Sequence, residues 1–375
     1  MRVLYLTEVF LPHIGGVEVL SGQLLRALAR RGHQFSVVAC CGDDPAAVAD
    51  SFDYHGIPVH RFRFRQSAQR GDVRTIADIL GRFTALRRAF RPELVHTSSW
   101  GSSSLLHGLA RSGSAARTLV TLHETLASPP APDGPAAKLL ATADWVAAIS
   151  SAVLADLHRF LPETIGRSSL IRNALEMPAL PPSRPPLDPP RLVAIGRLVP
   201  EKGFDLAIDA MPSVLARYPT ARLTIAGDGS EREALERRAE RLAVSRAVEF
   251  PGWVAPDDVP ALIARSSMVV MPSRWREPFG LVALQAAQGG RPVVATSRGG
   301  LPEIVVPGET GLLVDSDHPR ALAEAVVSLL DRPAVAARIG AAARERAERC
   351  FGWEVFVDAY DCLYRRLGDP RGGRA

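Results

Sequence analysis

The sequence predicts an α/β protein made of two Rossmann-like, doubly wound domains that face each other across a cleft. The chain has 375 residues, which exceeds the roughly 250–300 residues at which a single hydrophobic core stops growing. In both halves, short apolar runs alternate with amphipathic stretches, a pattern typical of parallel sheets covered by helices on both faces. A proline-dense segment, residues 177–190, separates the two halves. These three observations together indicate two domains joined by a linker.

The N-terminal domain is expected to span residues 1–176. It begins with a buried strand at 2–10 and an amphipathic helix at 17–33. The apolar positions of this helix recur at helical spacing and share one face; they are Leu20, Leu24, Ala27 and Leu28. Further strands are expected at 35–41, 93–99, 117–124 and 145–150.

The linker holds seven prolines among its fourteen residues, so it can neither continue a helix nor pair inside a sheet. The alternation then restarts over the C-terminal domain, residues 191–351. Strands are expected at 191–196, 221–227, 247–252, 268–273, 292–296 and 311–314, and a helix at 231–244. Ligands of doubly wound domains bind at the carboxyl ends of the strands, so residues that directly follow a strand are the candidates for a site.

The composition excludes several classes of protein. A net charge of +5, with 47% hydrophobic and 23% charged residues, is ordinary for a globular protein. The four cysteines match neither zinc-ligand spacing nor a disulfide framework. The N-terminal apolar run is too short for a signal peptide and no run reaches membrane-spanning length. We expect a cytoplasmic protein, and leave open peripheral contact with the inner face of the membrane.

Residues 61–91 carry nine arginines against two aspartates, with four phenylalanines interleaved: Phe62, Phe64, Phe83 and Phe90. Such a segment can dock on an anionic membrane surface or an acidic acceptor. It can equally be a solvated face around a flexible loop. No nucleic-acid recognition motif accompanies the charge, so no nucleic-acid partner is expected.

Two cations follow the first expected strand of the C-terminal domain. Arg197 and Lys202 lie in GRLVPEKG (196–203), and the chain has only one other lysine, Lys138. Arginine can grip a diphosphate with two hydrogen bonds and lysine can act as a point charge. In the N-terminal domain, Gly15 and Gly16 open the first helix, where backbone amides can approach an anion.

A second segment, 271–296, places Glu277 just before the start of an apolar helix near Leu281. The free amides around Phe279, Gly280 and Leu281 form a positive helix end that suits a phosphate. The Glu277 carboxylate can accept hydrogen bonds from sugar hydroxyls beside that phosphate. Gln285, one turn further on, can reach a ribose.

His123 follows the expected strand at 117–124 and is either a residue of the site or a structural histidine.

Taken together, these segments resemble the family-4 retaining glycosyltransferases of the GT-B fold. The resemblance covers nearly the whole chain and rests on segments in the family's order: GGVE (15–18), GRLVPEKGFDLAIDA (196–210), IAGDGSERE (225–233), FPGWV (250–254), EPFGLVALQ (277–285), GGLPEIV (299–305) and GETGLLV (308–314). It implies transfer of a hexose-type sugar from a nucleotide-diphosphate sugar to an acceptor hydroxyl, with retention and without a metal or other cofactor. It also implies an acceptor-binding N-terminal domain, with a C-terminal helix at about 352–368 packing back on it, and a donor-binding C-terminal domain.

The resemblance assigns roles to the candidate residues. Arg197, Lys202 and the amides near Phe279 would stabilise the leaving phosphate, while Glu277 would hold the sugar. His123 would position the sugar or polarise the acceptor. Val254 would join the donor-binding residues.

One position departs from the family pattern, because Gln285 stands where the family has a second glutamate that accepts hydrogen bonds from the ribose. A neutral hydrogen bond contributes about 1 kcal/mol where a charge-assisted one contributes about 1.5–3 kcal/mol. Weaker donor binding or an altered nucleotide preference is expected. The DSD run at 315–317 has metal-ligand spacing but no phosphate loop nearby, so no metal is expected there.

Two alternatives remain at this stage. Nucleotide-sugar 2-epimerases share the two-domain architecture, although they should lack the EPFG segment. A non-catalytic nucleotide-sugar-binding partner would account for Gln285. Neither the sugar and nucleotide nor the acceptor, whether lipid carrier, natural product or polysaccharide, follows from the sequence.

Overall fold

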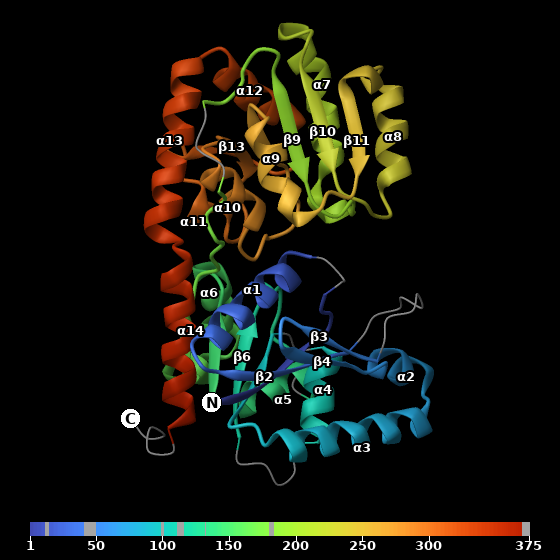
Figure 1. Ribbon diagram of the computed structural model, residues 1–375. Helices are drawn as coiled ribbons and strands as arrows, with labels where there is room; N and C mark the ends of the chain where they lie inside the picture. The colour runs from blue at the N-terminus through green and yellow to red at the C-terminus, as the bar shows by residue number, and fades with distance from the viewer. Residues whose placement is uncertain are drawn as a thin grey trace. The chain divides into compact units, whose positions relative to one another are not determined.

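The computed structural model describes residues 1–11, 15–40, 50–98, 101–110, 116–131, 133–179 and 184–369. Within this part, the chain forms two compact units, each built around its own sheet (Figure 1). Unit 1 contains Met1–Arg172 and Glu354–Ala375, and unit 2 contains Asn173–Trp353. The predicted class, α/β with two doubly wound domains, is confirmed.

The boundary between the units lies earlier in the sequence than expected. Residues 173–176, which were expected in the N-terminal domain, belong to unit 2. Gln288 donates its side-chain N–H to the carbonyl of Leu175 at 2.8 Å, which fastens this stretch to unit 2. The described residues of the proline-rich segment, 177–179 and 184–190, also belong to unit 2. The chain therefore passes into unit 2 before the prolines.

The sheet of unit 1 has the strand order β3-β4-β2-β1-β5-β6-β7-β8. All neighbouring strands pair in parallel except β3 and β4. The strands are β1 (Arg2–Thr7), β2 (Gln34–Ala39), β3 (Ser51–Tyr54), β4 (Ile57–Arg61), β5 (Leu94–Thr97), β6 (Arg117–Leu122), β7 (Trp145–Ala148) and β8 (Ser168–Leu170). The helices are α1 (Gly16–Arg30), α2 (Phe64–Arg70), α3 (Val73–Phe90), α4 (Ser102–Leu109), α5 (Pro135–Thr142), α6 (Ser151–Phe160) and α14 (Trp353–Gly368), with a 3-10 turn, η1 (Pro162–Arg167).

β3 and β4 form an antiparallel hairpin that is not among the strands expected from the sequence. His55 and Gly56 connect the two strands, and both have positive φ angles, 51° and 83°. Such a pair is the backbone geometry of the tight turns that connect twisted antiparallel strands. The strands are short, and a proline within an apolar run argues against a strand interior, so Pro58 weakened the pattern that would have predicted β4.

The basic segment 61–91 forms two packed helices, α2 and α3, so the flexible loop considered above is wrong for this stretch. Phe62, Phe64 and Phe83 are buried in the core between these helices and the sheet, and Phe90 packs against the same cluster. The rings of Phe62, Phe64 and Phe83 are therefore unavailable for insertion into a membrane. Most of the arginines of the segment remain exposed.

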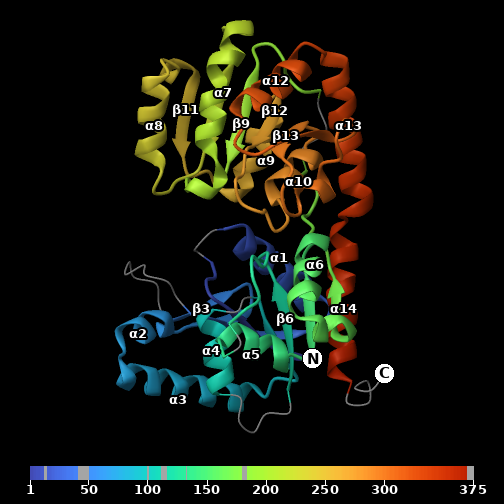
Figure 2. The same cartoon turned by 180° about the vertical axis from the view of Figure 1, so that it is seen from behind.

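The last helix, α14, belongs to unit 1 although it follows unit 2 in the sequence (Figure 2). The Tyr364 hydroxyl lies 2.6 Å from Nδ1 of His96 on β5. At the surface, Arg31 contacts Glu354 at 2.8 Å, and the buried His33 contacts Asp361 at 2.8 Å. A buried polar contact and an ion-pair cluster thus hold α14 against the strands and helix of unit 1.

The sheet of unit 2 has the order β11-β10-β9-β12-β13-β14, and every neighbouring pair is parallel. The strands are β9 (Arg191–Ile195), β10 (Arg222–Ala226), β11 (Val248–Gly252), β12 (Met268–Met271), β13 (Val293–Thr296) and β14 (Gly311–Val314). The helices are α7 (Phe204–Arg217), α8 (Arg232–Arg241), α9 (Val259–Ala264), α10 (Leu281–Gln288), α11 (Leu301–Ile304), α12 (Pro319–Leu330) and α13 (Pro333–Cys350). Short 3-10 turns are η2 (Pro200–Lys202), η3 (Ser245–Ala247) and η4 (Pro256–Asp258).

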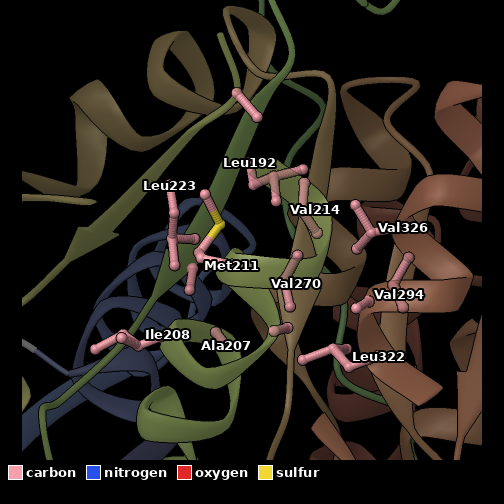
Figure 3. Packing of buried hydrophobic residues seen from close by; sticks show 14 of the residues in the cluster. Leu192, Ala207, Ile208, Met211, Val214, Leu223, Val270, Val294, Leu322 and Val326 are labelled. Carbon is pink, nitrogen blue, oxygen red and sulfur yellow. The ribbon is translucent and has the colours of Figure 1, made fainter. Parts of the chain in front are cut away.

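Each expected strand of this half corresponds to an observed one, and the observed strands are mostly shorter by one or two residues. The core of unit 2 lies between its sheet and the helices α7, α8 and α12. Figure 3 shows this packing, with Met211 and Val214 of α7 beside Leu192 and Val270 of the sheet, and Val326 of α12 beside Val294. Helix α10 contacts β12 and β13 and also packs against α9 and α13. Because side chains alternate along a strand, the sheet is apolar on both faces, as a covered parallel sheet requires.

Among the described residues, no helix is both long and apolar enough to cross a membrane.

Candidate functional site

The candidate site of unit 2 lies where the strand order of its sheet reverses. Counted along the chain, the order is 3-2-1-4-5-6, so the first and fourth strands, β9 and β12, are neighbours. The connections that leave them run to opposite sides, and ligands of doubly wound sheets bind in the crevice that this reversal opens. The loop after β9 carries Arg197 and Lys202, and the loop after β12 carries Glu277. The two sequence segments selected above therefore meet at the sheet's switch point.

Lys202 and Glu277 make direct contact across these two loops. The Lys202 ammonium donates to Oε1 of Glu277 at 2.6 Å, and the Ser273 hydroxyl donates to the same oxygen at 2.8 Å. The Glu277 side chain is only 6% exposed, and that of Lys202 is 21% exposed. Oε2 of Glu277 accepts no hydrogen bond from any residue that the structure describes. The lysine also retains two N–H donors, so one acceptor oxygen and two donors stay available at one point.

Two glycines allow the loops to approach so closely. Gly203 has φ of 65°, and a Cβ there would lie 2.1 Å from the carbonyl oxygen of Pro272. Gly299 also has φ of 65°, and its Cβ would lie 2.1 Å from the carbonyl oxygen of Glu277. A real Cβ cannot come that near to a backbone oxygen, so both positions need glycine. The backbone of Glu277 is thereby pressed between neighbouring loops and held in place.

Arg274 locks the same two loops together. Its guanidinium binds both carboxylate oxygens of Asp205 at 2.6 and 2.7 Å, and its Nε donates to Asp317 at 2.7 Å. Burial alone would raise the pKa of Asp205, but the hydrogen bonds and charge of Arg274 lower it below its ordinary value. The backbone N–H of Arg274 also donates to the carbonyl of Glu201 at 2.9 Å. This arginine fixes the loop that carries Lys202 relative to the loop that carries Glu277.

Helix α10 starts directly after this loop, with Gly280 as its N-cap residue and Leu281 as its first residue. The first amide bonded within the helix is that of Leu284, which donates to the carbonyl of Gly280 at 3.1 Å. The amides of the residues before Leu284 have no carbonyl partner within the helix and point out of its N-terminal end. This end of a helix attracts anions. Phe279 contributes only its backbone, because its ring is buried and packs edge-on against Phe351 at 5.7 Å. Gln285 is half-buried on the second turn of the helix.

The remaining predicted residues of unit 2 lie around this point. Arg197 is exposed in the loop after β9, and its guanidinium finds no acceptor among the described residues. Val254 is half-buried after the edge strand β11. Trp275 is 36% exposed, and the Lys202 ammonium lies 5.3 Å from the centre of its ring. This indole presents a flat apolar surface beside the ion pair, a feature that the sequence analysis missed.

The predicted residues of unit 1 lie at the carboxyl edge of the other sheet. His123 follows β6, and its buried Nδ1 has no hydrogen-bond partner. Burial lowers the pKa of His123 to about 4, so its imidazole is neutral at pH 7. Gly15 is the N-cap of α1 and Gly16 its first residue. A Cβ on Gly15 would lie 2.4 Å from a carboxylate oxygen of Glu18, so an anion at this helix end would have to compete with Glu18.

His123 also lies near a buried polar cluster. Its neighbour His96 contacts Tyr364 through Nδ1 and the Thr121 hydroxyl through Nε2, at 2.6 and 2.7 Å. Burial lowers the pKa of His96 to about 3, with a further contribution from His123. Thr121 in turn lies 3.1 Å from the Tyr360 hydroxyl. Both histidines are therefore neutral parts of unit 1, and the cluster joins β5, β6 and α14.

The described residues contain no group of three or more histidines, cysteines or carboxylates arranged to hold a metal. Of the DSD run, Asp317 is engaged by Arg274 and by the Ser316 hydroxyl, at 2.7 Å each. Ser316 and Arg274 hold the pKa of Asp317 below its ordinary value. These contacts use Asp317 as a structural acceptor.

Comparison with known proteins agrees with the geometry. Residues 14–177 match Glycosyltransferase Family 4, and residues 180–346 match Glycosyl transferases group 1. Over its whole length the chain is 32% identical to glycogen synthase of Mycobacterium tuberculosis, across 96% of that protein. The chain belongs to the family-4 glycosyltransferases. The enzyme is also 29% identical to the GDP-mannose-dependent alpha-(1-6)-phosphatidylinositol monomannoside mannosyltransferase of the same organism, over 95% of this chain and 96% of the relative.

Solved structures place this glycosyltransferase in the GT-B fold. Sucrose-phosphate synthase from Thermosynechococcus elongatus superposes with a TM-score of 0.84 at 26% identity, over 98% of this chain and 99% of the other. HepE of Anabaena, in complex with UDP and glucose, has a TM-score of 0.76 at 21% identity, over 97% of this chain and 99% of the other. The predicted family and fold are confirmed by these comparisons.

Proposed function

We propose that this enzyme transfers a sugar from a nucleotide-diphosphate donor to an acceptor hydroxyl, with retention of anomeric configuration and without a metal ion. The observation that carries the proposal is the contact between Lys202 and Glu277 at the switch point of unit 2. It brings a cation suited to phosphate and a carboxylate suited to sugar hydroxyls to one place, next to a helix N-terminus. A nucleotide sugar has these two groups adjacent, at the bond that breaks.

Unit 2 would bind the donor through three kinds of group. The free amides of α10, together with Arg197 and Lys202, would hold the diphosphate. Oε2 of Glu277 would accept a hydrogen bond from a hydroxyl of the sugar. Gln285 would reach the ribose from the second turn of α10, with a neutral amide in place of a carboxylate.

The cations would act most strongly in the transition state. As the bond from the anomeric carbon to the phosphate breaks, negative charge grows on the departing oxygen. The Lys202 ammonium, the Arg197 guanidinium and the helix amides can stabilise that charge as it forms, and this raises the rate rather than the affinity alone. These fixed charges supply what a divalent cation would otherwise provide. A phosphate oxygen of the leaving group would take the proton of the acceptor hydroxyl, which permits attack from the face that the leaving group vacates.

His123 would contribute a hydrogen bond rather than a charge. Because its pKa is about 4, the ring is neutral near pH 7 and cannot act as an acid with a full positive charge. Its Nδ1 is buried and unpaired, but the residue as a whole is only half-buried, so the accessible part of the ring can bond to a hydroxyl of the sugar or the acceptor. Unit 1 would bind the acceptor, whose identity we leave open; relatives act on partners as different as glycogen and a phosphatidylinositol mannoside, by their names.

The proposal is tested by measuring donor binding and transfer in the presence of EDTA. Thermal shifts of the full chain with UDP, GDP, ADP and dTDP sugars identify the nucleotide. NMR of the product then reports the anomeric configuration. Binding of one nucleotide sugar and a retained product, both insensitive to EDTA, support the proposal. Loss of activity in EDTA that Mg²⁺ or Mn²⁺ restores contradicts metal independence, and an inverted product contradicts retention. If no nucleotide sugar binds, Gln285 marks a lost donor site and the protein is a non-catalytic relative.

A further inference from the structure

A pocket opens in unit 2 beside Glu277, at the carboxyl ends of β13 and β14. The described residues that line it are Arg276, Ser297, Arg298, Gly299, Asp315 and Ser316. Its volume is about 480 Å³, within the range of roughly 300–1,000 Å³ that small-molecule sites occupy. Neither the diphosphate nor the sugar contacts proposed above use these residues.

The pocket is adjacent to the place where the donor sugar would be held. Arg276 directly precedes Glu277 in the sequence, and Gly299 packs against the Glu277 backbone, as described above. The cations proposed for the diphosphate, Arg197 and Lys202, follow β9. The pocket follows β13 and β14 instead, so in the order of the sheet it lies on the other side of Glu277, in the loop after β12, from these cations.

The charge of the pocket is positive. Arg276 and Arg298 are both exposed at its wall, and Asp315 is the only carboxylate among the lining residues that the structure describes. The nearby Asp317 is compensated by Arg274 at 2.7 Å. Ser297 adds a hydroxyl group that can bond to either donors or acceptors, and the Ser316 hydroxyl, which donates its proton to Asp317, can still accept a hydrogen bond. Two guanidinium groups favour a carboxylate or a phosphate, while Asp315 and the serines favour a ligand that also has hydroxyls.

We infer that this pocket binds an anionic sugar group, a carboxylate or phosphate attached to a hydroxylated ring. The anion pairs with Arg298 and Arg276, and ring hydroxyls bond to Asp315 and the serines. The group comes either from an acidic donor sugar or from an acidic acceptor. That the bound group is part of a donor or an acceptor rests on the proposed function. That the pocket binds an anionic sugar group does not rest on it.

Binding is measured on the full chain without any nucleotide. The probes are glucose 6-phosphate and glucuronate, with glucose as the neutral reference, at constant ionic strength. Ligand-observed NMR gives the affinities for the unchanged chain, for Arg298→Gln and for Arg298→Lys. Arg237→Gln is the matched control, because it removes an exposed arginine of the same unit from α8, where Arg237 pairs with Glu233.

If the pocket is an anion site, at least one anionic probe should bind more tightly than glucose. Arg298→Gln should weaken that binding by about tenfold or more, the loss of a charge-assisted hydrogen bond, and Arg298→Lys should weaken it less. Arg237→Gln should leave it unchanged. Equal loss in Arg298→Gln and Arg237→Gln overturns the inference, because it means that only net charge matters. Binding of glucose as tight as that of both anions, or no binding of either anion, also overturns it.

Transfer kinetics then distinguish the two sources of the anion. A rise in the KM of an acidic nucleotide sugar in Arg298→Gln assigns the pocket to the donor. A rise in the KM of a phosphorylated or uronic-acid acceptor assigns it to the acceptor. Should the chain show no transfer at all, the proposed function fails while the binding result still decides whether the pocket is an anion site.

Discussion

The Lys202 ammonium lies 2.6 Å from Oε1 of Glu277 and joins the loop after β9 to the loop after β12. The two residues are 75 positions apart in the sequence, yet each completes the surroundings of the other. The lysine compensates a nearly buried carboxylate, and Ser273 adds a second donor to the same oxygen. Removing one partner of such a pair leaves the other without compensation. The pair is therefore both a structural joint and, in the proposed function, the centre of donor binding.

Replacement of Glu277 by glutamine should separate these two roles. Glu277→Gln keeps the shape but replaces a charged acceptor with a neutral one, so we expect a loss of about 10- to 100-fold in kcat/KM for transfer. The affinity for the nucleoside diphosphate without its sugar should change less. Steady-state kinetics and calorimetric titration check this, with Glu324→Gln on the exposed face of α12 as the charge-matched control. An equal loss of nucleotide affinity and kcat/KM would show that Glu277 acts on the phosphates or on the fold.

The close approach of Gly299 to Glu277 gives a second prediction. Alanine at a left-handed position costs about 1–2 kcal/mol by itself. In Gly299→Ala the new Cβ must also displace the Glu277 backbone, so the free energy of unfolding and the activity should both fall further. Gly308→Ala is the control, since Gly308 has φ of 75° but nothing within 4 Å of its Cβ position. Urea unfolding and transfer assays measure both effects; if the two variants behave alike, the contact with Glu277 is unimportant.

Loss of the Tyr364 hydroxyl should weaken the attachment of α14 to unit 1. Tyr364→Phe leaves Nδ1 of the buried His96 without its partner, and an unpaired buried polar group costs about 1–3 kcal/mol. Tyr218→Phe removes a hydroxyl that contacts Asp331 at 2.6 Å on the surface, and this control should show a clearly smaller loss. Chemical denaturation, together with hydrogen exchange of α14, reports the difference. Unchanged exchange of α14 in Tyr364→Phe would contradict the role assigned to this contact.

The buried histidines should make unit 1 less stable as the pH falls. His96 and His123 have pKa values of about 3 and about 4 in the folded chain, against about 6.5 when unfolded. Between these values the unfolded chain binds protons that the folded chain does not, so stability is lost as the pH drops below about 6.5. Between its folded and unfolded pKa values, each histidine lowers the free energy of unfolding by about 1.4 kcal/mol for each pH unit that the pH falls.

The slope is measured by urea unfolding between pH 7 and pH 5, above the range in which most carboxylates titrate. His96→Gln should show a shallower slope than the unchanged chain, whatever its stability at pH 7. His55→Asn removes an exposed histidine of the same unit and should leave the slope unchanged. A slope in His96→Gln as steep as that of the unchanged chain would mean that His96 is protonated in the folded chain over this range.

Gln285 should limit the affinity for the nucleotide. In the proposed function Gln285→Glu restores a charged acceptor for the ribose, so the nucleoside diphosphate should bind up to about tenfold more tightly. Titration with a 2′,3′-dideoxy nucleotide is the control, because the gain should vanish without the ribose hydroxyls. A gain of equal size with the dideoxy nucleotide would show that Gln285 does not face the ribose.

The sequence by itself determined the alternation of strands and helices, the family and the loops that carry Lys202 and Glu277. These follow from local patterns: apolar runs, glycines after strands and short motifs in a fixed order. The alternation of apolar and polar residues did not predict elements whose local signal was weak. Pro58 obscured the β3–β4 hairpin, and the arginines of segment 61–91 obscured the fact that Phe62, Phe64 and Phe83 are core residues.

Only the tertiary structure decided which distant residues meet. Sheet order puts β9 next to β12, so Lys202 contacts Glu277 and Arg274 reaches Asp205, while Phe279 turns its ring away to Phe351. The return of α14 to unit 1 brings Tyr364 to His96, and the ends of β13 and β14 bring Arg298 and Asp315 to the pocket beside Glu277. These pairings depend on strand order and on the packing of helices against sheets. Residues far apart in the chain carry no local pattern that specifies their contact, so the sequence supplies the groups and the fold selects their partners.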